Sequence, residues 1–196
     1  MIARALLYAM SALLVGACAS TIPEHFYSLS ADTSPPIATT NNAVFSMTIE
    51  KVTVPELVDR PQIVLSKSEY QVSMMEGNRW AESLRQAIPR QIAANLRRQF
   101  SRASIATGSD STFNAQANYK LAMDVVRFES RLDDSVDLAV HWRLRNAAGI
   151  LVDRVSTLHE GSIGAGYDGL VAAHIKALAR LSDDIAAAVL ANPIGR

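Results

Sequence analysis

The sequence predicts an α+β domain with two layers, in which two amphipathic α-helices pack on one face of an antiparallel β-sheet. Two patterns carry this prediction. Several segments between residues 119 and 158 alternate apolar and polar side chains, which is the pattern of half-buried strands. Two longer segments, 79–100 and 167–191, repeat apolar residues at the spacing of one helix face. Consecutive strands at hairpin spacing favour an antiparallel meander over parallel strands joined by helices.

The first part of the domain is expected to form short strands. Four segments have strand character: 26–29, 44–54, 62–65 and 69–74. A connection rich in Ser, Thr, Pro and Asn, at 30–42, separates the first two. Pro55 ends the second strand, because proline cannot donate a hydrogen bond to a β-ladder, and residues 56–61 follow as a turn-like link.

The segment 79–100 is predicted to be the first helix, with Asn78 as its N-terminal cap. Its apolar stripe consists of Trp80, Leu84, Ile88, Ile92 and Leu96. Pro89 lies inside this segment and is expected to kink the helix, since proline removes one backbone hydrogen bond. The segment 167–191 is predicted to be the second helix. Its apolar face consists of Leu170, Val171, His174, Leu178, Leu181, Ile185 and Val189.

Three longer strands are predicted between the two helices. The first carries on one face Tyr119, Leu121, Met123 and Val125. The second alternates most regularly, and its apolar face consists of Val136, Leu138, Val140, Trp142 and Leu144. Residues 146–149 form a hairpin turn, after which 150–158 returns as the third strand.

The first 17 residues have the layout of a secretory signal peptide, with Arg4 near the start, an apolar run at 5–15 and small residues at the end. Cys18 follows directly, and the segment 14–18 (Leu-Val-Gly-Ala-Cys) resembles the lipobox of bacterial lipoproteins. The run is shorter than the about 20 apolar residues that a membrane span requires. Cys18 is the only cysteine, so it has no intramolecular disulfide partner. The alternatives are an ordinary signal peptide that contains a cysteine, or a short membrane anchor.

The lipobox resemblance implies cleavage before Cys18 and acylation of its thiol, so that a membrane surface holds the mature domain. Residues 18–25 then form the tether, in which the segment 19–24 spans about 20 Å when fully extended. Residues 26–196 form the domain. Ala19 stands where an aspartate often signals retention in the inner membrane of Gram-negative bacteria. The resemblance therefore implies the periplasmic face of the outer membrane.

Length and charge limit the functions of the mature chain. Without the leader, 179 of the 196 residues remain, which is enough for one domain with a full core. The leader holds one of the 19 basic residues and no acidic one, so the mature chain carries 18 basic and 19 acidic side chains. The chain therefore lacks the basic excess that is typical of proteins that bind nucleic acid.

No catalytic or metal-binding pattern emerges from the sequence. The loop 161–166 (Gly-Ser-Ile-Gly-Ala-Gly) lacks the Lys-Ser/Thr of a phosphate-binding loop, and a flexible connection is the favoured interpretation. His141 and His159 could approach each other across paired strands, but two ligands make a weak zinc site. The acidic pairs 133–134 and 183–184 are interpreted as a turn and a solvated helix face. We therefore expect no enzyme activity, no cofactor and no metal.

Two segments make the domain similar to a known family. Residues 54–64 (Val-Pro-Glu-Leu-Val-Asp-Arg-Pro-Gln-Ile-Val) and 79–84 (Arg-Trp-Ala-Glu-Ser-Leu) resemble the ABC-type transport auxiliary lipoproteins, a family that includes the paraquat-inducible type of intermembrane transport system. The similarity extends from 26–29 to 181–186 and covers nearly the whole mature chain. Ser83 differs from the proline that is common at this place in the family.

The resemblance implies a non-enzymatic subunit at the outer membrane. Its partners would be an inner-membrane permease and ATPase, and a mammalian-cell-entry domain protein that bridges the periplasm. The exported substrate would be a lipid or another hydrophobic compound. Candidate contacts with the bridging protein are Asp59, Arg60, Pro61, Trp80 and Glu82. Alternatively, Asp59 and Arg60 only pair with each other to fix the turn before the next strand. A homo-oligomeric ring around a multimeric bridge is a further expectation.

Two other classes of function remain open at this point. One is a stand-alone envelope lipoprotein that binds a small apolar ligand in its own core, and the other is a periplasmic hydrolase. Neighbouring genes for a permease, an ATPase and a bridging protein would favour the transport subunit. An apolar ligand in the purified domain would favour the carrier.

Overall fold

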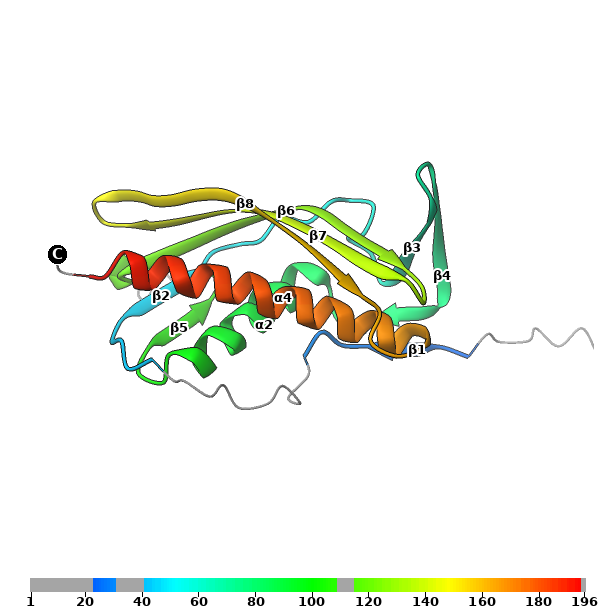
Figure 1. Cartoon of the computed structure of the whole chain (residues 1–196), viewed down its shortest axis with the longest axis horizontal. Coiled ribbons are helices and arrows are strands. Elements are labelled where there is room, and N and C mark those ends of the chain that lie inside the picture. Colours follow the sequence, from blue (N-terminus) through cyan, green and yellow to red (C-terminus); the bar gives the residue numbers. More distant parts are fainter. Residues whose placement is uncertain (1–22, 31–40, 109–114, 195–196) are drawn as a thin grey trace, which may run out of the picture.

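The computed structural model describes residues 23–30, 41–108 and 115–194. Within these ranges the elements follow in the order β1 (His25–Tyr27), β2 (Ser46–Ile49), β3 (Gln62–Ser68), β4 (Gln71–Trp80), α2 (Leu84–Gln99), β5 (Ser104–Thr107), β6 (Tyr119–Arg131), β7 (Ser135–Asn146), β8 (Gly149–Gly161) and α4 (Gly166–Ala191). Figure 1 shows the two helices side by side beneath the long strands. The arrangement confirms the predicted α+β class.

The strands form two mixed sheets. The five-stranded sheet has the order β5-β2-β6-β7-β8, and the three-stranded sheet has the order β1-β4-β3. β6, β7 and β8 form the predicted antiparallel meander, but β2 is parallel to both β5 and β6, and β1 is parallel to β4. The expectation of one purely antiparallel sheet is therefore wrong. The parallel pairs join strands that are far apart along the chain, and such pairing leaves no mark on the alternation within each strand.

The meander supplies the sheet face of the core. All five apolar residues predicted for the inner face of β7 are fully buried. The four predicted for β6 are at most 3% exposed. On the outer face, polar side chains such as Asp124 and His141 lie opposite each other on β6 and β7. The two-residue period thus identified the buried face of these strands correctly.

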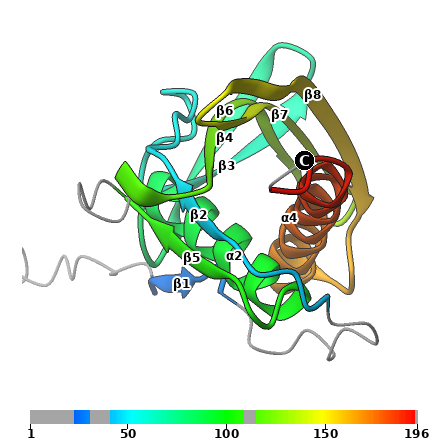
Figure 2. The same cartoon turned by 90° about the vertical axis from the view of Figure 1, so that its left-hand side faces the viewer.

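Both helices lie on the concave side of the five-stranded sheet, which curves around them in the end-on view of Figure 2. The predicted apolar face of α4 is confirmed, since all seven of its residues are buried. A buried polar chain joins the two helices: Asn95 Nδ2 donates to Ser182 Oγ at 3.1 Å, and Ser182 Oγ donates to the Leu178 carbonyl at 2.8 Å. Because buried polar groups need partners, these hydrogen bonds fix the alignment of α2 against α4.

Charged side chains fasten α4 to the edge strand β8. The buried carboxylate of Glu160 accepts hydrogen bonds from Lys176 at 2.9 Å and from Arg180 at 2.5 Å. Burial acts to raise the pKa of Glu160, but these two cations outweigh it and the pKa is lowered. Asp184, which the sequence placed on a solvated face, accepts a hydrogen bond of 2.6 Å from Ser156 Oγ. The acidic pair therefore also contributes to packing.

The start of α2 differs from the prediction. The helix begins at Leu84 and not at Arg79, because β4 continues to Trp80. Asn78 lies in this strand and pairs with β1, so it does not cap the helix. Ser83 occupies the cap position with extended backbone angles. The four-residue spacing that begins at Trp80 thus arises from a strand end followed by a helix.

Other boundaries shift less. β2 covers only Ser46–Ile49, after which a single bridge joins Thr53 to Asp124. Pro89 lies inside α2, as predicted, and is buried, whereas the kink stays a prediction. Among the described residues, no helix has both the length and the apolar character that crossing a bilayer requires.

α4 offers a matched pair of leucines for a test of the core. Leu178 is fully buried, whereas Leu190 on the same helix is 49% exposed. Leu178→Ala should lower the free energy of unfolding by about 2–5 kcal/mol, because the deleted methyl groups leave a cavity. Leu190→Ala should lower it by less than about 1 kcal/mol. Urea unfolding followed by circular dichroism measures both changes, and equal losses would contradict this packing.

Candidate functional site

The predicted lipid-attachment site lies outside the described residues, which begin at Pro23. Acylation of Cys18 and cleavage before it therefore stay predictions. The signature residues of the two family-like segments are all described. They come together at the base of the hairpin that β3 and β4 form. We call this region, residues 55–61 and 79–85, the hairpin junction.

Asp59 fastens one side of the hairpin junction to α2. The amides of Val58 and Asp59 both donate to the Pro55 carbonyl, at 3.0 and 3.1 Å, and close the predicted turn. Asp59 Oδ2 forms an ion pair with Arg85 Nη2, at 2.7 Å, next to the start of the helix. Asp59 thus pairs with Arg85 and not with Arg60. Arg85 was not among the residues predicted from the sequence, since a partner 26 positions away leaves no periodic signal.

Arg60 and Pro61 lie where β3 begins. Arg60 reaches across the hairpin, where its Nη1 lies 2.8 Å from the sulfur of Met74. Its Nε is buried without a hydrogen-bond partner. The Pro61 carbonyl accepts a hydrogen bond of 2.7 Å from the Trp80 amide, whereas the Pro61 side chain is exposed. Both residues therefore shape the base of the hairpin, and Pro61 also contributes to its surface.

Trp80 does not lie on the surface where the candidate partner contact was predicted. It is the last residue of β4 and is only 6% exposed. Its ring packs edge-on against Phe128 and against His174, with 6.1 Å between ring centroids in each case. A side chain buried in this way cannot contact a partner protein. Trp80 belongs to the core, and the candidate contact surface is corrected accordingly.

Glu82 fastens the other side of the hairpin junction. Its carboxylate forms an ion pair with Arg90 on α2. Arg90 Nη2 also lies 3.5 Å from Ser30 Oγ, which links the helix to the chain that follows β1. The amide of Ala81 donates to the Tyr27 carbonyl at 2.7 Å. The two family-like segments therefore join β1, the hairpin and the start of α2.

A buried histidine lies next to Trp80. His174 is fully buried, its ring stacks on Phe128 with centroids 4.1 Å apart, and its Nε2 lies 2.8 Å from Ser130 Oγ. Its Nδ1 is buried without a hydrogen-bond partner. Burial lowers the pKa of His174 to about 3, so the imidazole is neutral near pH 7. The sequence placed His174 on the apolar face of its helix, but it gave no sign of Ser130.

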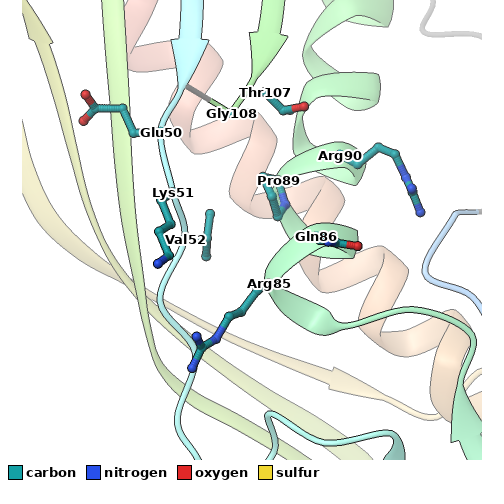
Figure 3. A pocket seen from close by; sticks show the side chains of 9 residues that line it. All are labelled: Glu50, Lys51, Val52, Arg85, Gln86, Pro89, Arg90, Thr107 and Gly108. Atoms are coloured by element: carbon teal, nitrogen blue, oxygen red, sulfur yellow. The ribbon is translucent and has the colours of Figure 1, made fainter. Parts of the chain in front are cut away.

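An open pocket of about 460 Å³ lies beside the hairpin junction (Figure 3). It is lined by Glu50, Lys51, Val52, Arg85, Gln86, Pro89, Arg90, Thr107 and Gly108. Three of its charged side chains form ion pairs with residues outside the lining: Arg85 with Asp59, Arg90 with Glu82 and Glu50 with Arg145. Figure 3 shows Arg85 and Arg90 pointing to opposite sides of α2. These lining residues do not converge on a common point, so the pocket does not support a catalytic centre.

The glycine-rich loop 161–166 has a packing role. A Cβ on Gly169 would lie 2.3 Å from the Gly164 carbonyl oxygen, so only glycine permits this approach of the loop to α4. The amide of Gly166 donates to Asp133 Oδ1 at 2.6 Å. The predicted turn at 133–134 thus binds the first residue of α4. These contacts account for the glycines without a ligand.

His141 and His159, which the sequence analysis considered as a weak zinc site, are not paired with each other in the ladder. In the β7–β8 ladder, His141 lies opposite Val155, and His159 lies opposite Asp137. Each imidazole contacts an aspartate instead, His141 with Asp153 and His159 Nδ1 with Asp137 at 2.8 Å. Within the described ranges, no three potential metal ligands gather in one place.

Comparison with known proteins identifies the family. A family model described as the ABC-type transport auxiliary lipoprotein component matches residues 27–186. The chain belongs to this family. A crystal structure of an uncharacterized protein superposes with a TM-score of 0.68 at 24% identity, over 85% of this chain and 99% of the other. Protein XCC0632 from Xanthomonas campestris, of family DUF330, gives 0.66 at 17% identity, over 82% and 91%. These likenesses concern the fold alone, and no curated protein matches the chain.

The ion pair of Asp59 in this auxiliary lipoprotein can be tested with a double-mutant cycle. Asp59→Asn and Arg85→Gln should show a coupling free energy of about 0.5–1 kcal/mol, the range of partly exposed ion pairs. Asp59→Asn and Arg60→Gln should show almost none, because Arg60 reaches Met74 instead. Urea unfolding of the single and double variants measures both couplings. A larger coupling to Arg60 than to Arg85 would show that the described pairing is wrong.

His174 should make the stability of the auxiliary lipoprotein fall in acid. Its pKa is about 3 in the folded state and about 6.5 in an unfolded chain, so the unfolded state binds more protons between these values. Its contribution is complete above about pH 6.5, and it is lost by about 1.4 kcal/mol per pH unit as the pH falls toward 3. His174→Gln should therefore flatten the decline in unfolding free energy between pH 6 and pH 5.

Urea unfolding at several pH values measures this slope. The exposed His25 in β1 supplies the control, since His25→Gln removes a surface imidazole. An acid slope that is as steep in the His174 variant as in the unmodified protein would contradict a neutral buried imidazole.

Proposed function

We propose that the chain is an outer-membrane lipoprotein on the periplasmic side, a non-enzymatic auxiliary subunit of an ABC-type system that moves a lipid or another hydrophobic compound between membranes. The observation that carries this proposal is the family match over residues 27–186, which spans nearly the whole domain. The apolar leader that ends at Cys18 supports the anchored location. Two or more acyl chains on one residue attach a protein stably to a bilayer.

The hairpin junction is the proposed docking surface for a bridging protein with mammalian-cell-entry domains. With Trp80 in the core, the surface consists of Asp59, Arg60 and Pro61, together with Leu57, which is 46% exposed. An exposed leucine and proline beside partly exposed charges resemble the apolar centre and polar rim of a protein interface. Glu82 lies at the edge of this surface, where its ion pair with Arg90 holds it.

The chemistry of the junction supports a binding role. The charged groups of Asp59 and Glu82 are engaged in ion pairs with Arg85 and Arg90 of α2. Such pairs position a surface and leave no acid or base poised for proton transfer. The permease and ATPase would supply the energy for transport, and this subunit would hold the outer-membrane end of the bridge.

A pull-down tests the proposal. The protein, tagged at its C-terminus, is isolated from detergent-solubilised envelope, and bound proteins are identified by mass spectrometry. The expected result is recovery of a bridging protein together with its permease. Recovery of the lipoprotein alone with bound lipid would favour the independent carrier.

Arg60→Glu tests the docking surface within the same pull-down. Reversal of this charge should lower recovery of the bridging protein several-fold, because charge complementarity guides association. Arg102→Glu is the matched control, since Arg102 is exposed beyond the far end of α2. Thermal unfolding establishes that both variants are folded. Unchanged recovery with a folded Arg60→Glu variant would disprove docking at this surface.

A further inference from the structure

The three-stranded sheet carries apolar side chains that are exposed in the described part of the domain. Tyr70, in the β3–β4 turn, is 90% exposed, and Val72 and Met74 on β4 are 40% and 43% exposed. We call these three residues the hairpin surface. Phe26, on β1 of the same sheet, is 61% exposed. Figure 1 shows the hairpin standing away from the body of the domain. Apolar side chains gathered on one projecting element mark a contact surface.

The chain that leads to Cys18 leaves the domain beside this hairpin. β1 pairs in parallel with the end of β4, with His25 opposite Asn78. The six residues 19–24 join Cys18 to His25 and reach about 20 Å when extended. The eight residues from Gln71 to Asn78 reach about 26 Å along β4. The lipid anchor and the tip of the hairpin therefore extend from the same place and have similar reach.

The other end of the domain lies beyond this reach. α4 begins beside β1, where the rings of Tyr27 and Tyr167 are 5.6 Å apart, and runs away for 26 residues. At the rise of an α-helix this is about 39 Å. Figure 1 shows the β7–β8 turn and the C-terminus at that far end. A tether of about 20 Å holds the hairpin end close to the membrane and leaves the far end away from it.

From this geometry we infer that the hairpin surface lies on the lipid bilayer that holds the acyl chains of Cys18. Tyrosine combines an apolar ring with a polar hydroxyl and is enriched at the level of lipid headgroups. Lys67 and Glu69 are exposed beside the turn, and they limit insertion to the interface because charges are costly in hydrocarbon. Val72 lies next to Tyr70 at the level of the headgroups, and Met74, whose sulfur contacts Arg60, lies farther from the tip. The inference rests on the proposed acylation and on no transport partner.

Spin labelling of the full-length, acylated protein tests this contact. Cys18 is the only native cysteine, and acylation blocks its thiol, so an introduced cysteine takes the label alone. Tyr70→Cys reports on the hairpin tip. Ala147→Cys, exposed in the β7–β8 turn at the far end, is the matched control. Each labelled protein is reconstituted in vesicles of phosphatidylethanolamine and phosphatidylglycerol, without any transport partner.

The measurement is the collision rate of the label with oxygen, which concentrates in lipid, and with a water-soluble nickel chelate. The ratio of oxygen to nickel collisions should be several-fold higher at position 70 than at position 147. Equal ratios would place the hairpin in water and overturn the inference. A fall in both rates at position 70 would mean that protein covers the hairpin, which also overturns it. Intact mass measures acylation: an unacylated protein would contradict the anchor and this inference together, whereas an acylated protein with equal ratios would contradict the bilayer contact alone.

Discussion

The packing of α4 against the inner face of β7 is the contact on which the rest of the domain depends. β7 is hydrogen-bonded on both sides, to β6 and to β8, so the burial of its apolar face fixes the register of the whole meander. A slip of one residue would turn Trp142 toward solvent and bring Arg143 into the core. The same register sets the polar contacts of the interior. It places Trp142 Nε1 at 3.0 Å from Ser156 Oγ, and it brings Ser130 of β6 to His174 of α4.

The two family-like segments hold together the place where three elements meet. Within a few residues β4 must end, α2 must begin and β1 must pair alongside, and each step needs a contact that holds it in place. Trp80 supplies the apolar part of this junction by packing edge-on against the stacked rings of Phe128 and His174. The ion pairs of Asp59 and Glu82 supply the polar part. Partly exposed ion pairs add little to stability, so their main effect is on the orientation of the hairpin relative to α2.

The sequence predicted which face of a helix or strand is buried, because burial on one side leaves a periodic pattern in that segment. It did not predict which distant segment or side chain each element contacts. The inner faces of β6, β7 and α4 were predicted residue by residue, because burial on one side imposes a period. The parallel pairs of β1 and β2 were missed, since a strand looks the same whichever way its neighbour runs. Trp80 matched the helix period by coincidence, and pairing with β1 kept it in a strand. At the site, the turn at 56–61 was predicted, but Arg85 was not found as the partner of Asp59, because a single ion pair leaves no repeat.

The parallel pairing of β1 with β4 connects the proposed anchor to the proposed docking surface. The inferred contact of the hairpin surface with the bilayer would hold both ends of the hairpin at fixed distances from the membrane. With its tip at the bilayer, the seven residues of β3 place Pro61 at most about 23 Å from the headgroups. An extended tether of six residues alone would let the domain tilt freely. The hairpin is hydrogen-bonded along its length, and the ion pair of Asp59 with Arg85 joins its base to α2, so it would set this height more firmly than the tether. A protein that spans the periplasm would thus meet Asp59, Arg60 and Pro61 before it reaches the lipid.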